Sequence, residues 1–419
     1  MNIRLSYVGA LMFGLWVASW GYAQTNGPNQ VPNRFQAPTN TPPMPIRPAS
    51  APDLQLASMR PFQRQTYFGG KAGMQWLMRF NQPNGRFLYG YVPALATPLL
   101  ENNYTHQAAA TYALARASRV YKDKQATALA RQALLTLLLE TRVEGSNPGV
   151  RRPAFAGNTL AASGWLVMAI YALPEPGKDL LDQAEQLCQF IRQHQEKSGA
   201  FSLLPGGKVV GKHSHDTDCG SALVGLALGQ KIRPADWKLT SLRNACAFYH
   251  ADWKKRKRAN MIPLQSVAYS QAFLLTKENG FRDCVLEMND WLCSRQYQQL
   301  NNQRLMWYGG FQTDQANSLP DVHSAKFVES LAHACLIVRE TGDLKRYQNY
   351  RRHIERGLEF LGNLQYTQAN TQQFAERYHS EILGAFHGSH QDGNIRIDYI
   401  QEAVCAYMQY LASVDPLGS

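Results

Sequence analysis

The sequence predicts an all-α fold, an (α/α)6 toroid in which six helical hairpins close into a ring. Three observations predict it. A helix ending in a bulky apolar pair, then Gln or Asn, then Gly-x-Phe recurs along the chain at intervals of roughly 58 residues. Helices rich in Ala, Gly and Ser alternate with helices that carry more charge. The apolar–polar alternation typical of strands is nearly absent.

The recurring Gly-x-Phe phrase marks the hairpins. Two weaker copies, near 152–155 and 248–253, fill the gaps between four clear ones, so that six units span the chain. Short β segments are expected only at 86–91 and 201–210. The clear copies end in Gly85-Arg86-Phe87, Gly199-Ala200-Phe201, Gly309-Gly310-Phe311 and Gly384-Ala385-Phe386.

Two kinds of helix define the two rings of the toroid. Segments such as 179–195 and 343–364 place apolar residues at i, i+3, i+4 and i+7, which is typical of amphipathic helices on an outer surface. The other helices are rich in small residues, which allow close packing, and they are expected to form the inner ring. These are 108–117, 161–172, 221–229, 266–275, 324–336 and 402–411.

The termini have other compositions. Residues 1–23 resemble a secretory signal peptide, with Arg4 before an apolar stretch and Gly21-Tyr22-Ala23 at its end; a membrane anchor is the alternative. Residues 24–61 form a disordered proline-rich linker, which is either a spacer or a tail without a role. The toroid is expected over 62–413, followed by a short tail over 414–419. The chain is therefore expected to be exported to the periplasm, cell envelope or extracellular space.

The net charge restricts the class of binding partner, and the placement of the cysteines bears on disulfide bonding. The net charge of +12 favours an anionic partner such as an acidic glycan, and no nucleic-acid-binding motif accompanies it. The densest basic run is 254–258. It is either a binding site for such an anionic partner or a solvated helix end, where cations interact favourably with the helix dipole. The seven cysteines fall in helical patterns and are interpreted as small buried hydrophobes without a disulfide framework. Membrane contact is expected only through an uncleaved signal, and no cofactor is expected.

Two resemblances follow from these patterns. The Gln…Gly-x-Phe phrase is similar to the QW repeat of terpenoid cyclases and protein prenyltransferases. The six hairpins and the exported setting resemble six-hairpin glycosidases, polysaccharide lyases and the C-terminal domain of glucuronyl epimerases, over residues 62–413. Both imply a toroid. Asp216-Thr217-Asp218-Cys219-Gly220 is similar to the Asp-x-Asp-Asp-Thr-Ala proton-donor motif of class II terpenoid cyclases, but departs from it at Cys219 and Gly220.

The starts of the inner helices are expected to converge on one mouth of the ring, where helix N-termini add positive potential. Carboxylates there can act as a general acid and base, and their alternative role is helix capping. Asp218 and Asp398 are the expected acid/base pair. For Asp398, a structural ion pair with Arg396 is the alternative. The catalytic candidates are His215, Asp216, Asp218, Asp398 and Tyr399.

Substrate-binding candidates come from the same loops. Aromatic rings can stack on sugars, and cations can neutralise an acidic sugar. Core packing is the alternative for the aromatic residues. A zinc site at His213 and His215 is a weak possibility, and no metal is predicted. The substrate-binding candidates are Tyr89, Tyr104, His106, Asn158, Gln265, Trp307, His323, Lys326 and Arg396.

The sequence therefore predicts an exported, carbohydrate-active toroid that hydrolyses, eliminates or epimerises an anionic glycan. Its alternatives are a non-catalytic toroid that binds glycan, lipid or protein, and a terpenoid cyclase- or prenyltransferase-like protein. A gap below about 10 Å between Asp218 and Asp398 in an open pocket favours the enzyme. Burial of these carboxylates against arginines favours binding or structure. Motifs of serine hydrolases, P-loop nucleotidases and zinc proteases are absent.

Overall fold

The computed structural model describes residues 59–145, 147–154, 158–202, 215–299, 305–314 and 318–413, with the backbone alone at 215–218. The expected signal peptide, nearly all of the expected linker and the C-terminal tail lie outside these residues. The first helix, α1, begins at Pro61, where its fixed φ suits the first turn. Within the described part of the chain, no helix is long and apolar enough to cross a membrane.

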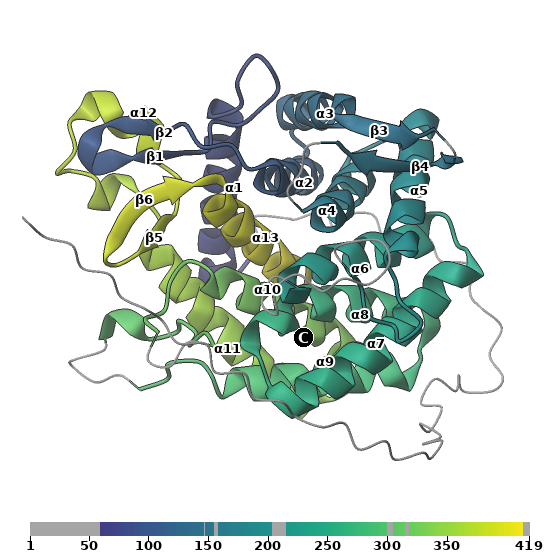
Figure 1. The fold of residues 1–419 in the computed structure, drawn as a ribbon. Coiled ribbons are helices and arrows are strands. Elements are labelled where there is room, and N and C mark those ends of the chain that lie inside the picture. Colours follow the sequence, from purple (N-terminus) through teal and green to yellow (C-terminus); the bar gives the residue numbers. More distant parts are fainter. Residues whose placement is uncertain are drawn as a thin grey trace, which may run out of the picture. The chain divides into compact units, whose positions relative to one another are not determined.

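Six helical hairpins form the body of the structure, and each contributes one helix to each of two rings (Figure 1). The outer helices are α1 (Pro61–Arg79), α3 (Lys124–Leu139), α5 (Lys178–Gln193), α7 (Asp236–Arg256), α9 (Asn279–Cys293) and α11 (Leu344–Asn363). The inner helices are α2 (Tyr104–Val120), α4 (Thr159–Ala172), α6 (His215–Ile232), α8 (Ile262–Thr276), α10 (Ser324–Glu340) and α13 (Ile397–Ser413).

The inner helices close into a ring. Each packs on the next in chain order, and α13 packs on α2. All six small-residue segments named from the sequence fall on these helices. Small size is required where α4 meets α6, because a Cβ on Gly164 would lie 2.3 Å from the backbone of Ser221. The predicted (α/α)6 toroid is therefore confirmed.

The Gly-x-Phe phrase is one repeated turn. In each clear copy the glycine has a positive φ, between 83° and 94°, which L side chains rarely adopt. The turn brings the Gln or Asn at the end of the outer helix back against the phenylalanine as an isolated antiparallel bridge. The bridges join Asn81 to Phe87, Gln195 to Phe201, Gln296 to Phe311 and Gln365 to Phe386.

The glutamines of this turn also link successive hairpins. Gln296 donates from Nε2 to the carbonyl of Gly309 in its own turn and to that of His353 on α11, both at 2.8 Å. Gln365 donates to Gly384 at 3.0 Å and to Gly69 on α1 at 2.9 Å. The second of these bonds joins the last turn to the first helix, so the phrase helps to close the ring.

Strands are more extensive than the sequence indicates. The order β2-β1-β6-β5 forms an antiparallel sheet from both ends of the toroid, and β3 and β4 form a separate hairpin where the second copy of the phrase was expected. The short helix α12 (His379–Ile382) precedes β5. The strands are β1 (Gly90–Val92), β2 (Thr97–Leu99), β3 (Thr141–Glu144), β4 (Asn147–Pro153), β5 (His387–Ser389) and β6 (Asp392–Arg396).

Two sequence-based expectations about local structure are corrected by these strands. No strand was expected within 387–399, yet this segment contains β5 and β6, because β6 pairs with β1, which is far away in the sequence. The expected β segment at 86–91 overlaps β1 only at its end, and most of 201–210 lies outside the described residues. All seven cysteines are buried free thiols, as their helical placement indicated.

Candidate functional site

A cavity of about 360 Å³ opens at the mouth of the ring. Its walls come from the first turns of α2, α4, α8, α10 and α13, together with the end of β6 and the turn between α7 and α8. The predicted convergence of inner-helix starts is thus confirmed for these five helices. The described polar residues that line the cavity are Thr105, His106, Asn260, His323, Lys326, Glu329, Arg396, Asp398, Gln401 and Glu402.

The sixth inner helix, α6, begins beside this cavity. A Cβ on Gly220 would lie 2.6 Å from Leu264, and Ser221 donates from Oγ to the carbonyl of Ala161 at 3.1 Å. Leu264 and Ala161 both line the cavity. The side chains of His215, Asp216 and Asp218, in the first turn of α6, lie outside the described residues, as does His213. The separation of Asp218 and Asp398 is therefore untested.

Asp398 forms the ion pair that the sequence left open as its alternative role. Arg396 donates from Nε and Nη2 to the two carboxylate oxygens of Asp398, at 3.0 and 2.8 Å. The guanidinium also lies 5.4 Å from the ring centre of Tyr89 and 4.9 Å from that of Tyr399. Only 7% of Asp398 is exposed. This bidentate geometry fixes both side chains and leaves Asp398 little freedom to transfer protons.

His106 contacts the same group of side chains. Its Nδ1 lies 3.1 Å from the hydroxyl of Tyr89 and 3.7 Å from a carboxylate oxygen of Asp398. Burial lowers the pKa of His106 despite the nearby Asp398 charge, so its ring is neutral at neutral pH. Burial likewise raises the pKa of the Tyr89 hydroxyl. His106 therefore presents an uncharged ring to the cavity, and the buried Tyr89 lies behind the lining and contacts His106 and Arg396.

His323 and Glu402 form a second charged pair in the cavity. The Nδ1 atom of His323 lies 2.8 Å from Oε2 of Glu402. The charge of Glu402 raises the pKa of His323. Burial alone would raise the pKa of Glu402, but the charges of His323 and Lys326 outweigh burial and lower it. His323 and Glu402 therefore form a hydrogen-bonded imidazolium–carboxylate pair between the lowered pKa of Glu402 and the raised pKa of His323.

Glu402 is not among the catalytic or binding candidates predicted from the sequence. The signal that could have found it is its spacing: Asp398 and Glu402 are four residues apart, and both lie on the cavity-facing side of α13. Lys326, one turn into α10, also lines the cavity. It forms no ion pair with any other described residue, so it is a cation available to a ligand.

The floor of the cavity is a buried charged cluster. Arg116 on α2 donates from Nη1 to Glu329 on α10 at 2.6 Å, and from Nη2 to Gln409 on α13. Burial would lower the pKa of Arg116, but Tyr112 and Glu329 outweigh burial and raise it. The guanidinium thus stays charged and joins three neighbouring inner helices. Glu329 is the one member of this cluster that lines the cavity.

Four predicted binding residues lie elsewhere. Tyr104 donates its hydroxyl to the carbonyl of Leu137 at 2.7 Å. Asn158 caps α4 by accepting from the amide of Ala161 at 3.0 Å. Trp307 packs against Tyr297, with ring centres 5.6 Å apart. Gln265 is fully buried on α8. None of the four lines the mouth cavity.

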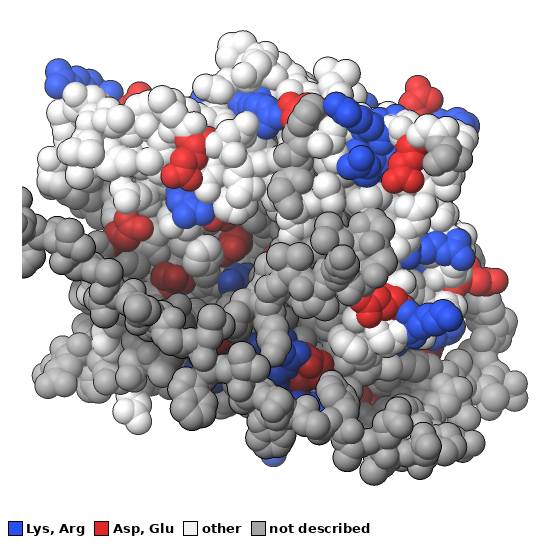
Figure 2. Space-filling model, viewed as in Figure 1, with Lys and Arg blue, Asp and Glu red and all other residues white. Residues whose placement is uncertain are grey.

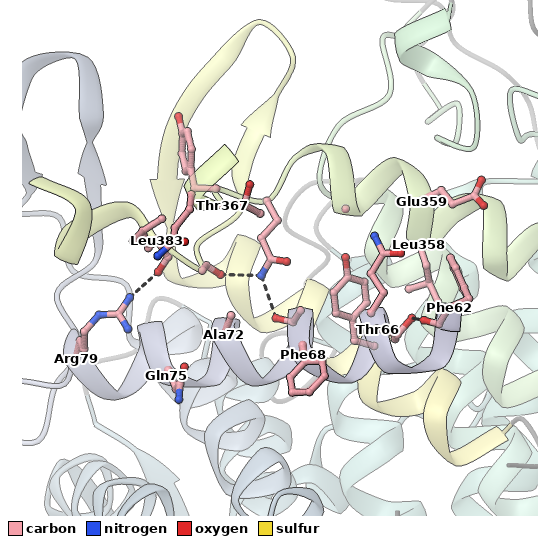
Figure 3. Close-up of a pocket in the computed structure, with 18 residues that line it drawn as sticks. Phe62, Thr66, Phe68, Ala72, Gln75, Arg79, Leu358, Glu359, Thr367 and Leu383 are labelled. Atoms are coloured by element: carbon pink, nitrogen blue, oxygen red, sulfur yellow. Dashed lines mark hydrogen bonds between the residues drawn. The ribbon is translucent and has the colours of Figure 1, made fainter. Parts of the chain in front are cut away.

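A second depression, of about 470 Å³, lies on the outer ring between α1 and α11. Figure 3 shows Phe62, Thr66, Phe68 and Arg79 spaced along α1, which forms one side of the depression. Its charged side chains are Arg79 and Glu359, and two backbone carbonyls accept from Arg79. It therefore lacks the paired titrating groups of the mouth cavity, which we take as the candidate active site.

Two further observations concern the surface charge and the possible metal ligands. In Figure 2, acidic and basic side chains are interspersed over the visible face, with no large field of one sign. Among the described residues, no group of three or more His, Cys, Asp or Glu side chains is arranged to hold a metal ion. Separately, the hydrogen-bonded imidazole and carboxylate of His323 and Glu402 are groups suited to proton transfer.

Solved structures similar to this chain share its fold. They include an unsaturated glucuronyl hydrolase specific for heparin, with 14% identity and a TM-score of 0.58 over 85% of this chain and 99% of that one. An alpha-1,6-mannanase of a Salegentibacter species, in complex with alpha-1,6-mannotetrose, has 12% identity and a TM-score of 0.56, covering 83% and 99%. Cellobiose 2-epimerase from Bacillus thermoamylovorans has 12% identity and a TM-score of 0.56, covering 81% and 96%.

The structural likeness extends over most of the described chain, so the protein has the (α/α)6-toroid fold of the six-hairpin glycosidases. No protein-family model matches the sequence. No curated protein matches it either. These identities show the fold alone, and function must be argued from the site.

Proposed function

We propose that the protein is an exported enzyme that processes an acidic glycan by proton transfer in the mouth cavity. The observation that carries this proposal is the hydrogen-bonded pair of His323 and Glu402 beside the unpaired cation Lys326 in one cavity. Export rests on the sequence of residues 1–23. The similar solved structures bear names of glycan-processing enzymes, which supports a glycan as the substrate class.

Each side chain has a proposed role. Lys326 binds the acidic group of the sugar, since it lines the cavity and has no ion pair with another described residue. Glu402 and His323 exchange the proton with the reacting sugar carbon or glycosidic oxygen. Arg396 and Asp398 form a rigid polar wall that orients the sugar, with the ring of Tyr89 packed behind Arg396. Tyr399, whose ring lies 5.5 Å from that of His323, supports the imidazole from the side.

Asp218 remains a candidate for the second carboxylate. It stands one turn before Ser221, in the part of α6 that begins beside the cavity. Glycoside cleavage requires two carboxyl groups, one as acid and one as base or nucleophile. Because Arg396 holds both oxygens of Asp398, we propose the pair Glu402 and Asp218 in place of the pair Asp218 and Asp398 expected from sequence.

The polar and charged lining of the cavity also bears on the two alternative functions, an isoprenoid enzyme and a non-catalytic binding toroid. Ten of the described side chains that line the cavity are polar, which does not support an isoprenoid substrate. The fixed pair of Arg396 and Asp398 favours a second candidate function, a toroid that binds an acidic glycan without turning it over. Turnover measurements separate the two.

The test is turnover of a panel of acidic and neutral polysaccharides in deuterated water, followed by proton NMR. New reducing ends report hydrolysis, a new C4–C5 double bond reports elimination, and deuterium at C5 without cleavage reports epimerisation. We expect one of these on an acidic glycan, with loss of turnover in Glu402→Gln. Binding of an acidic glycan without any of the three reactions would overturn the enzyme proposal in favour of the binding toroid.

A further inference from the structure

A basic run lies at the rim of the mouth cavity. It comprises residues 254–258, at the end of α7 and just beyond it, and it consists of five consecutive cations. Four of them are exposed, and Arg258 is half-buried. Lys257 has a left-handed backbone, with a φ of 42°, so the chain turns sharply at this point. The turn directs the chain from the outer ring into α8 of the inner ring.

Local carboxylates neutralise only part of this basic run. Lys254 lies 3.0 Å from Glu287, and Arg256 and Arg258 both pair with Asp252. Lys255 and Lys257 form no ion pair with any described residue, and Lys257 instead lies 5.5 Å from the ring centre of Trp253. The run therefore presents an excess of positive charge to solvent.

The position of this charge is fixed relative to the cavity. Asn260, two residues after the run, lines the cavity wall. Asp314 accepts hydrogen bonds from the amides of both Ala259 and Asn260, at 2.5 and 3.2 Å. The basic run is thus anchored at the rim, with its exposed lysines on the outward side of a residue that lines the site.

Favourable interaction with the helix dipole does not account for the whole run. That interaction is confined to the last turn of a helix, whereas Lys257 and Arg258 lie beyond the end of α7. The opposite end of the ring provides a comparison. There, Lys122 has a similar φ of 53° and Lys124 begins α3, at the far end of α2 and about 25 Å from the mouth.

We propose that this basic run is an outer binding site for the acidic groups of a glycan chain that leaves the cavity past Asn260. The substrate is then a chain of several acidic sugars, held at Lys326 inside the cavity and at Lys255 and Lys257 on its rim. This inference rests on the proposed function, because it extends the same site.

The test compares binding of fluorescent polygalacturonate chains with binding of the corresponding disaccharide, by fluorescence anisotropy, so that it needs no turnover. Lys255→Gln with Lys257→Asn removes the two free cations, and Asn tolerates the left-handed backbone. Lys122→Asn with Lys124→Gln is the matched control at the far end. We expect the first double variant to weaken chain binding about tenfold and to flatten its salt dependence, while disaccharide binding stays unchanged. The control should bind like the wild type.

Two further outcomes separate the rim from the cavity. Excess disaccharide should displace the chain from the wild type if the chain enters the cavity, and Lys326→Gln should weaken binding of both ligands. Equal loss of chain binding in the control variant, or chain binding that excess disaccharide does not displace, would overturn the outer site. Failure of the proposed enzyme function appears differently, as intact binding of both ligands without turnover.

Discussion

At the scale of single residues, two carboxylates one turn apart on α13 have different surroundings. Arg396 holds both oxygens of Asp398, whereas Glu402 meets an imidazole that can exchange its proton. The second arrangement suits proton transfer, because the imidazole of His323 can take up and release a proton beside Glu402.

The first prediction concerns activity. Glu402→Gln keeps the size of the side chain but removes the group that exchanges protons, so kcat on the acidic glycan should fall about 10²–10⁴-fold with a small change in KM. Glu359→Gln, in the groove between α1 and α11, is the matched control and should keep wild-type kinetics. Equal loss of activity in both variants would contradict the role of Glu402.

The second prediction concerns pH and stability. The folded-state pKa of His323 is raised above its ordinary 6.5, so the stabilisation from its pairing is complete below 6.5 and is lost as pH rises through the raised value. The pKa of Glu402 is lowered below 4.5, so its contribution is present above 4.5 and is lost as pH falls through the lowered value. The stabilisation should therefore be largest between pH 4.5 and 6.5.

Denaturant unfolding of the wild type and of His323→Asn across pH checks this second prediction. The difference in free energy of unfolding should peak in that mildly acidic window and shrink at alkaline pH. A difference that does not vary with pH would show that the two side chains are not paired ionically.

The sequence predicted the candidate site better as a region than as a set of roles. His106, His323, Lys326, Arg396 and Asp398 do line one cavity. The residues at the starts of the inner helices include helix caps as well as site residues, and composition does not distinguish the two. Asn158, which was predicted to bind substrate, is a helix cap. Glu402 was passed over because an acidic residue inside an apolar helix gives no local sign of its partner, which is 79 positions away in the chain.

At the scale of elements, the Gly-x-Phe turn is the repeated device. Its glycine meets the backbone of the next outer helix: a Cβ on Gly309 would lie 2.1 Å from the carbonyl oxygen of Arg356. Its glutamine bonds to the same neighbouring helix. In Gln296 the Oε1 atom also accepts from Nδ1 of His353, whose ring is neutral because burial lowers its pKa to about 4.

The third prediction ranks two copies of this turn. Gln296→Ala removes bonds to Gly309 and His353 and should lower the free energy of unfolding by roughly 2–4 kcal/mol. Asn81→Ala removes one bond within its own turn and should cost about 1 kcal/mol. Urea unfolding measures both. A larger loss for Asn81→Ala would show that the contact with the neighbouring hairpin adds no stability.

The fourth prediction separates backbone strain from close approach. Gly309 and Gly342 both have positive φ, but a Cβ on Gly342 meets nothing within 4 Å. Gly342→Ala should cost about 1–2 kcal/mol through its backbone conformation alone. Gly309→Ala adds the clash with Arg356 and should cost more. Equal costs would remove close approach as the reason for glycine in the turn.

The elements were largely predictable because their signals are local. The helical period, the small-residue content and the glycine turn each depend on residues that lie close together within one repeat. The sheet of β2, β1, β6 and β5 was not predictable in the same way, since it joins residues near 91 to residues near 395. Strand pairing of this range depends on the closed ring, which short patterns do not describe.

At the scale of the whole molecule, the ring closes twice. On the outside, Gln365 bonds to Gly69 of α1. In the inner ring, Arg116 of α2 reaches Glu329 of α10 and Gln409 of α13. The first and last hairpins are thus joined at the periphery and under the cavity floor, so the geometry of the site depends on closure of the complete ring.

The fifth prediction tests how much the buried ion pair of Arg116 and Glu329 contributes to stability. Arg116→Met leaves the buried carboxylate of Glu329 unpaired and should lower the free energy of unfolding by about 3–5 kcal/mol. Arg116→Met combined with Glu329→Met removes both charges and should recover most of that loss. Denaturant unfolding measures the pair of variants. A single-variant cost below about 1 kcal/mol would place this ion pair among weakly contributing surface pairs.

The measurement that tests the central claim most directly is a crystal structure of the Glu402→Gln variant soaked with a short acidic oligosaccharide. The predicted result is a sugar in the mouth cavity, with its acidic group within hydrogen-bonding distance of Lys326 and a ring atom facing position 402. A sugar bound instead in the groove between α1 and α11, with the mouth empty, would contradict the account.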